Sequence, residues 1–118
     1  MLYEDITKVI LAGFYAVYNT LGHGFLEQVY ENALAHELCK RGLAIEQQKQ
    51  ITVYYDGVVV GTYYADIVVD DKIILELKIS DPHESHEAQL LNYLKATGLR
   101  LGFVLYYGKE AIYRRKIV

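Results

Sequence analysis

The chain has 118 residues, of which 53% are hydrophobic and 23% charged, and it contains a single proline. This composition excludes a disordered or linker-rich chain, and the length predicts one domain over residues 1–118. No apolar run approaches the roughly 18 residues that a membrane-spanning helix requires, so we expect no membrane partner. The single cysteine, Cys39, cannot form an internal disulfide, and the N-terminus lacks the pattern of an export signal. Both features predict a cytoplasmic protein.

Charge is unevenly distributed along the chain, although the net charge is only −3. Residues 1–90 hold six basic and fourteen acidic residues, whereas residues 91–118 hold six basic residues and one acidic residue, Glu110. Three of these basic residues, Arg114, Arg115 and Lys116, are weak candidates for binding the phosphates of a nucleic acid. A solvated terminal strand explains them at least as well, because charge runs commonly keep exposed elements soluble.

The first third of the chain has the apolar spacing of two helices. The spacing predicts a helix from residue 3 to about residue 20, with an apolar face formed by Ile6, Val9, Ile10, Gly13, Phe14 and Val17. Gly22 and Gly24 interrupt it, because glycines one residue apart favour a turn. A second helix is expected from about residue 25 to residue 41, where Lys40, Arg41 and Gly42 form a typical helix end.

The pattern then changes to short runs rich in β-branched residues and tyrosine. Strands are predicted over residues 51–55, 58–69 and 72–79, and they most simply form an antiparallel meander. Asp81 followed by Pro82 and Glu84 predicts a helix with Asp81 as its N-cap and Gly98 at its end. Two further strands are expected at 99–107 and 111–118. The resulting order, α-α-β-β-β-α-β-β, predicts an α/β sandwich in which helices cover a mixed sheet.

Charged residues interrupt two of the apolar strands. Asp66 lies in one strand, and Glu76 and Lys78 share one face of the next, because they are two residues apart. A three-residue loop at residues 70–72 would place Asp66 opposite Glu76, whereas a two-residue loop would place it opposite Leu75. Either register brings the two carboxylates together.

Two carboxylates in a largely apolar sheet are unfavourable unless something compensates their charge. Carboxylate oxygens in this arrangement suit a hard divalent ion, Mg²⁺ or Mn²⁺. A salt bridge of Lys78 with Glu76 or Asp66 on a half-exposed sheet explains the same pattern equally well. Spacing alone leaves both interpretations open.

Four motifs resemble, in order, those of the GxxExxY family, a small branch of the PD-(D/E)XK nuclease superfamily. The segment from Gly24 through Glu27 to Tyr30 reproduces the naming motif, and Ala65-Asp66 is similar to the Ala-Asp strand of the family. The segment from Glu76 to Lys78 is similar to its E-x-K signature. Residues 86–95 and 98–102 resemble its distal helix and the strand that follows. Together these motifs extend over nearly the whole chain.

The resemblance implies a restriction-endonuclease-like three-layer sandwich that hydrolyses phosphodiester bonds of nucleic acid. It implies that Asp66 and Glu76 bind Mg²⁺ or Mn²⁺ together with the backbone carbonyl of Leu77, and that Lys78 assists the attacking water. Glu27 would enter the same site, with Gln89, Tyr93, Tyr30 and Gly24 in supporting positions. Without the resemblance, Glu27 is better explained as a favourable charge in the first turn of its helix.

Two other functions stay open at this stage. The chain is also consistent with a catalytically silent module of the same fold that binds nucleic acid or protein, and with a structural protein held by an ion network. The sequence does not distinguish DNA from RNA. A core this small has no separate domain to grip a duplex, so a homodimer or a partner protein is a further expectation.

Overall fold

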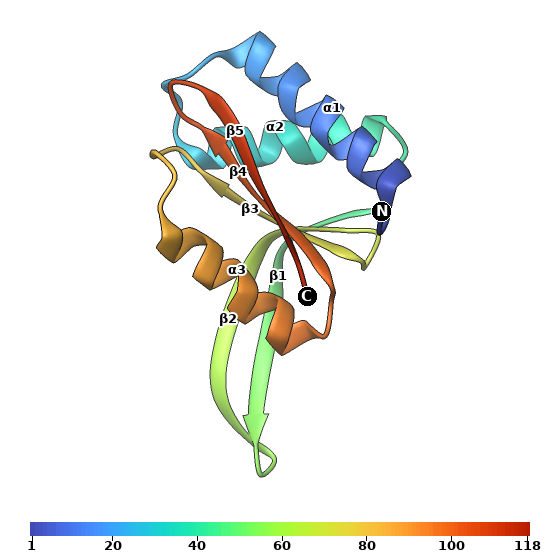
Figure 1. Cartoon of the computed structure of the whole chain (residues 1–118), viewed down its shortest axis with the longest axis vertical. Coiled ribbons are helices and arrows are strands. Elements are labelled where there is room, and N and C mark those ends of the chain that lie inside the picture. Colours follow the sequence, from blue (N-terminus) through green and yellow to red (C-terminus); the bar gives the residue numbers. More distant parts are fainter.

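The computed structural model describes residues 1–118, and its eight elements follow the predicted order (Figure 1). They are α1 (Glu4–Leu21), α2 (Glu27–Lys40), β1 (Ile45–Tyr55), β2 (Val58–Val69), β3 (Ile73–Lys78), α3 (Glu84–Thr97), β4 (Leu101–Tyr107) and β5 (Ala111–Ile117).

One five-stranded sheet of order β1-β2-β3-β4-β5 forms the middle layer. Neighbouring strands are antiparallel except β3 and β4, which are parallel, with α3 as the connection between them. The helices α1 and α2 pack on one face of the sheet, and α3 packs on the other (Figure 1). The α/β fold, the mixed sheet and the three-layer sandwich predicted from the sequence are therefore confirmed.

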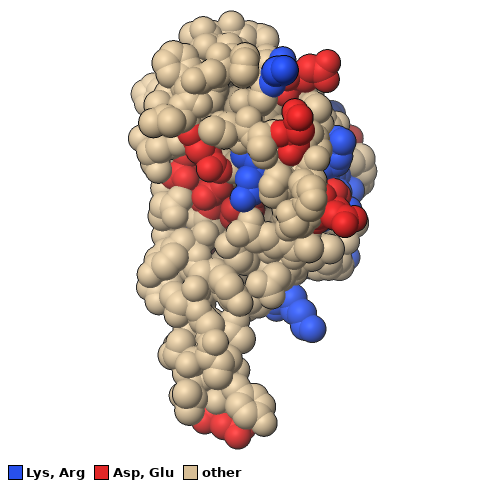
Figure 2. Space-filling view, turned by 90° about the vertical axis from the view of Figure 1, so that its left-hand side faces the viewer, with Lys and Arg blue, Asp and Glu red and all other residues tan.

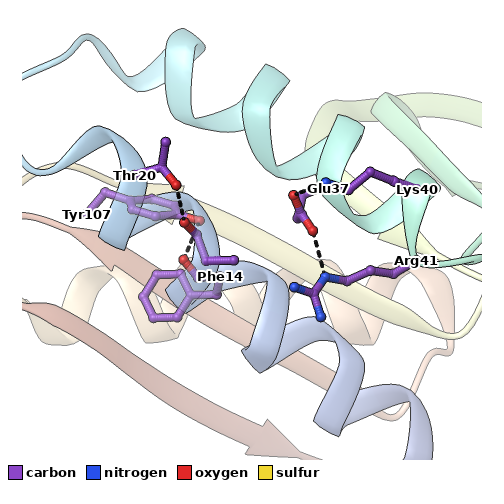
Figure 3. Close-up of polar contacts among 7 residues, drawn as sticks. Phe14, Thr20, Glu37, Lys40, Arg41 and Tyr107 are labelled. Atoms are coloured by element: carbon purple, nitrogen blue, oxygen red, sulfur yellow. Dashed lines mark hydrogen bonds and ion pairs between the residues drawn. The ribbon is translucent and has the colours of Figure 1, made fainter.

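The larger core lies between the sheet and the helices α1 and α2. Alternate residues of β3 and β4 point into it, because successive side chains of a strand face opposite sides. Tyr107 from β4 stacks on Tyr30 from α2, with ring centroids 4.5 Å apart. The Tyr107 hydroxyl donates to the carbonyl oxygen of Phe14 at 3.4 Å (Figure 3). Near the end of α2, Glu37 pairs with Arg41 at 2.7 Å, and Lys40 also contacts it (Figure 3).

The smaller core lies between the sheet and α3. Leu90, Tyr93 and Leu94 from the helix contact Ile74 and Val104 from the sheet. The helix approaches β4 closely at Gly102, where an added Cβ atom would lie 2.6 Å from a methyl carbon of Leu90. The absence of a side chain at position 102 therefore sets how near α3 lies to the sheet.

Two predicted boundaries are wrong. The helix α3 does not begin at Asp81 and Pro82: its N-cap is His83, whose Nδ1 accepts from the backbone N–H of Ser85 at 3.0 Å. A tertiary contact helps to fix this start, because the Tyr106 hydroxyl lies 2.9 Å from Nδ1 of His86. The first strand begins at Ile45 rather than at residue 51, because a polar run typical of a loop pairs with β2 instead.

The far ends of β1 and β2 extend beyond the three-layer body as a hairpin arm, residues 50–65 (Figure 1). The molecule is accordingly elongated, with principal extents of 47, 27 and 24 Å. The arm turns at Asp56 and Gly57, as their sequence predicted. None of the helices is long and apolar enough to cross a membrane.

Because α3 approaches β4 closely at Gly102, a methyl group added there should destabilise the protein more than one added at a less crowded glycine. We expect Gly102→Ala to lower the free energy of unfolding by about 1–3 kcal/mol, because the methyl group overpacks the contact with Leu90. Gly108→Ala is the matched control, since the nearest atom there lies at an ordinary 3.6 Å. Urea unfolding of both variants measures the difference, and equal stability of the two would contradict this packing.

Candidate functional site

The strands β2 and β3 separate from each other at Asp66 and Glu76. The ladder between β2 and β3 comprises only the pairs of Ile67 to Val69 with Ile73 to Leu75. Beyond it, β2 continues with β1 into the hairpin arm, while β3 continues beside β4. We call the point where they separate the fork. The pairing of Val69 with Ile73 shows that the loop has three residues, which selects the register with Asp66 opposite Glu76.

At the fork, each carboxylate binds a backbone N–H group of the other strand. Glu76 Oε1 accepts from the N–H of Asp66 at 3.1 Å, and Asp66 Oδ2 accepts from the N–H of Leu77 at 2.8 Å. Side chains therefore satisfy backbone donors that the shortened ladder leaves unpaired. The two carboxylates are held together by the same feature that opens the sheet.

Glu76 is a buried carboxyl group, with 3% of its surface exposed. Burial, and secondly the nearby Asp66 carboxylate, raise its pKa from the ordinary 4.5 to about 9. The metal-free protein consequently holds Glu76 in its protonated form at neutral pH. A cation at the fork would reverse this preference, because it favours the ionised carboxylate.

Lys78 makes no ion pair. None of the six salt bridges in the structure involves it, so no carboxylate oxygen lies within 4.0 Å of its ammonium nitrogen. Its charge still reaches the site, where it opposes the rise in the pKa values of Glu76 and Glu27. The salt-bridge interpretation of these residues is therefore wrong, and a charged lysine is left free beside the fork.

Glu27, in the first turn of α2, lies within electrostatic range of the fork. Burial raises its pKa, the Asp66 carboxylate raises it further, and Lys78 lowers it. At the surface of the body, above the hairpin arm, acidic side chains gather around a basic one (Figure 2). Glu27 thus lies close enough to interact electrostatically with this region, although it belongs to another layer of the fold.

Gln89 and Tyr93 lie on α3 and bind each other, with Gln89 Nε2 donating to the Tyr93 hydroxyl at 3.0 Å. The pKa of Tyr93 is raised by burial first and then by Glu76 and Asp66, so its hydroxyl lies near the two carboxylates. Its ring also contacts that of Tyr63 in the arm, at 5.5 Å between centroids. The distal helix therefore borders the fork.

Tyr30 and Gly24 shape the loop before α2 rather than line the fork. The Tyr30 side chain is fully buried, and its hydroxyl donates to the carbonyl oxygen of Gly22 at 2.6 Å and accepts from the N–H of Phe25 at 3.3 Å. Gly24 has a φ angle of 117°, which residues with a side chain rarely adopt. The naming motif thus combines a charged residue near the site with two residues that fold the preceding loop.

The three basic residues of β5 do not form one patch. Arg114 and Lys116 pair with Val104 and Gly102 on the α3 face, whereas Arg115 pairs with Phe103 on the opposite face. Lys116 is bound to Glu87 of α3 at 2.7 Å. Arg115 has a buried Nε atom without a hydrogen-bond partner. Of the three, only Arg114 is exposed.

Two residues at the site have no counterpart among the predicted site residues. Gln48 of β1 donates through Nε2 to Asp66 Oδ1 at 3.3 Å and to Glu31 Oε1 at 2.7 Å. Glu31 of α2 is a second buried carboxylate, 3% exposed. In the sequence, residues 46–50 are a polar run outside the predicted strands, and nothing in that run distinguishes Gln48 from its neighbours.

The donor set at the fork fits a hard divalent cation. It offers the oxygens of Asp66 and Glu76, with no histidine or cysteine beside them that would favour a transition metal. No three His, Cys, Asp or Glu side chains come together in a metal-binding cluster. Two carboxylates suffice for Mg²⁺, which commonly keeps several waters and binds through one or two carboxylates and the phosphates of a substrate.

One solved structure, of SSO0001, supports the fold. A crystal structure of SSO0001 superposes with a TM-score of 0.59 at 20% identity, over 98% of this chain and 59% of that one. The chain thus spans about three fifths of the length of that relative. An alkaline exonuclease, LHK-Exo from Laribacter hongkongensis, gives a TM-score of 0.49 at 10% identity, over 99% of this chain and 71% of the exonuclease.

The sequence comparison is more specific than the structural one. No curated protein matches the sequence. The family model described as the PD-(D/E)XK nuclease superfamily matches residues 4–117, which include every element of the fold and all residues at the fork. The chain therefore belongs to the PD-(D/E)XK nuclease superfamily.

Proposed function

We propose that the protein is a metal-dependent nuclease that hydrolyses phosphodiester bonds at the fork. The observation that carries this proposal is the buried Glu76 beside Asp66, with no basic side chain paired to either carboxylate. Burying a carboxylate without a compensating charge is costly, and a bound divalent ion would remove that cost. Membership of a nuclease superfamily supports the same assignment.

In this proposal, Asp66, Glu76 and the backbone carbonyl of Leu77 would hold Mg²⁺ or Mn²⁺, and Glu27 would add negative charge close to the ion. When bound there, the ion would make hydroxide available near neutral pH and stabilise charge on the phosphate. The cross-strand bonds hold Asp66 and the Leu77 backbone together, so two of these groups keep a fixed relation before a substrate arrives. The acidic groups repel a polyanion until a cation is bound, which makes substrate binding depend on the metal.

Lys78 acts on the water and the phosphate. Because it has no carboxylate partner, its ammonium group is free to orient the attacking water and to stabilise negative charge in the transition state. Gln89 and Tyr93 border the same space from α3 and support the position of the substrate. A catalytically silent binding module is the alternative, and it would need neither a free lysine nor a hydrolytic water.

Within the superfamily, we place the chain in the GxxExxY branch. The support is the arrangement of Gly24, Glu27 and Tyr30: the glycine and the tyrosine fold the loop, and the glutamate lies within electrostatic range of Asp66. We further propose that nucleic acid, DNA or RNA, is the substrate, and that the protein works in the cytoplasm. Arg114 is the residue of β5 that would contact the phosphates.

Substitutions of the carboxylates and of the lysine should affect different steps: metal binding depends on the carboxylates, and the cleavage rate depends on the lysine. We expect Asp66→Asn to abolish Mn²⁺ binding measured by calorimetry, because it removes a ligand charge. Lys78→Met should bind Mn²⁺ normally and reduce the cleavage of labelled DNA or RNA by about 10²–10³-fold. Lys72→Met, an exposed lysine next to the same strand, is the control and should cleave at the wild-type rate. Unchanged cleavage by Lys78→Met would contradict the mechanism.

The raised pKa of Glu76 predicts how the metal-free protein responds to pH. Between pH 4.5 and about 9 the folded state holds a proton that the unfolded chain has lost. The free energy of unfolding therefore falls as pH rises through this range, by at most about 1.4 kcal/mol per pH unit. Glu76→Gln should flatten this dependence in denaturant titrations with EDTA, whereas Glu110→Gln should not. A wild-type curve without this fall would show that Glu76 ionises normally.

A further inference from the structure

Gln48 has an unusual backbone for a residue inside a strand. Its φ angle is 50°, in the left-handed region that residues other than glycine rarely adopt. Its neighbours Gln47 and Lys49 pair regularly with Ile67 and Ala65, which places Gln48 directly across from Asp66. Strained residues of this kind persist only where the surrounding contacts hold them, and they concentrate at functional sites.

The strained backbone has a visible consequence for the side chains. Successive side chains of a regular strand point to opposite faces. Here Gln47 and Gln48 both reach Glu31: Gln47 Nε2 donates to its Oε2 at 2.8 Å, and Gln48 Nε2 to its Oε1 at 2.7 Å. The left-handed turn at Gln48 thus brings two consecutive amides to one buried carboxylate.

Only one of the two amides continues to the fork. Gln48 Nε2 also donates to Asp66 Oδ1 at 3.3 Å, whereas Gln47 instead contacts Asn32 Oδ1 at 2.9 Å. The other oxygen of Asp66 accepts from the N–H of Leu77. Both oxygens of Asp66 are therefore held, one from β3 and one from β1, and Glu31 anchors the second contact to α2.

We propose that Gln48 is a positioning residue that orients the Asp66 carboxylate for the metal, with Glu31 as its anchor. The inference rests on the proposed function, because it concerns Asp66 as a metal ligand. Groups that orient a ligand before the metal binds commonly contribute 10- to 100-fold to metal affinity or activity. The strained backbone of Gln48 is what allows its amide to reach both carboxylates.

The first test compares metal affinity in two matched variants. Each of Gln48→Met and Gln47→Met loses one hydrogen bond to Glu31, but only Gln48→Met loses the contact with Asp66. We expect calorimetry to show Mn²⁺ binding about tenfold weaker for Gln48→Met and within twofold of wild type for Gln47→Met. Gln48→Gly relieves the left-handed backbone and keeps the fold, and it should be weakened like Gln48→Met. Equal affinities of the Gln48 and Gln47 variants would overturn the proposal.

A second measurement needs no metal. In nitrogen-15 spectra with EDTA, Asp66→Asn should shift the side-chain amide resonances of Gln48 but leave those of Gln47 in place, while Glu31→Gln should shift both. If the Gln48 resonances do not shift in Asp66→Asn, the contact between the two side chains does not exist. A wild type that binds no Mn²⁺ would instead refute the proposed function and the metal role of Gln48, and the amide spectra would still decide whether the contact exists.

The hairpin arm carries an independent inference, because its surface is apolar and almost uncharged. Among residues 50–65 the only Asp, Glu, Lys or Arg is Asp56, at the tip (Figure 2). Seven of its side chains are between 36% and 70% exposed: Tyr54, Tyr55, Val58, Val59, Val60, Tyr63 and Tyr64. An exposed apolar patch of this kind marks an interaction site. The arm offers no cation for nucleic acid, which favours a protein partner.

We infer that a second copy of this chain covers the arm. Strand β1 is an edge of the sheet, and residues 51–55 contain neither the lysine nor the proline that usually protects such an edge. Antiparallel pairing of two β1 strands would match identical edges and place the two Asp56 tips at opposite ends. Two exposed tyrosines, Tyr54 and Tyr55, lie on this edge strand itself and would lie against the partner strand, whereas the other five exposed side chains lie on β2.

Sedimentation of the purified chain at several concentrations tests this assembly. We expect a wild-type dimer and a monomeric Tyr54→Lys variant, because a lysine on the edge strand β1 opposes the pairing of two such edges. Ile117→Lys, an exposed apolar residue on the opposite edge strand, is the control and should stay dimeric. A monomeric wild type, or a dimer that Tyr54→Lys does not disrupt, would overturn the inference.

Discussion

The exchange of hydrogen bonds between Asp66 and Glu76 is the interaction on which the rest of the site depends. Each carboxylate accepts a backbone N–H from the opposite strand where their ladder ends. Because these donors are satisfied, β2 can leave β3 and continue into the arm without orphaned backbone groups. The same exchange brings two acidic side chains together inside the sheet, which creates the electrostatic cost that a cation would relieve.

Three other elements, α2, β1 and α3, contribute residues to this site. The helix α2 contributes Glu27 near the fork and Glu31 behind it, and β1 contributes Gln48 between Glu31 and Asp66. The helix α3 contributes Gln89 and Tyr93, and its distance from the sheet depends on Gly102. Lys78 completes the surroundings as the charged group that no carboxylate neutralises. The three-layer fold is thus what gathers residues that are far apart in the sequence.

The sequence predicted the fold and the charged residues well, because both leave local signals. Helical spacing located α1 and α2, and the interrupted apolar strands identified Asp66, Glu76 and Lys78. It missed Gln48 and Glu31, because a glutamine in a polar run and a glutamate inside a helix look like solvent-exposed residues. The start of α3 was also misplaced, because Asp81 and Pro82 satisfy the local rule, whereas the observed start has His83 as its cap and Tyr106 beside its first turn. Tertiary contacts decided both cases.

A divalent ion bound at the fork would replace the proton on Glu76, and proton release measures this exchange directly. Calorimetric titration of Mn²⁺ at pH 7, in buffers of different ionisation enthalpy, counts the protons displaced per ion bound. We expect the release of about one proton by wild type and much less by Glu76→Gln, because the group with a pKa of about 9 holds the exchangeable proton. Binding without proton release, or no binding at all, would contradict this expectation.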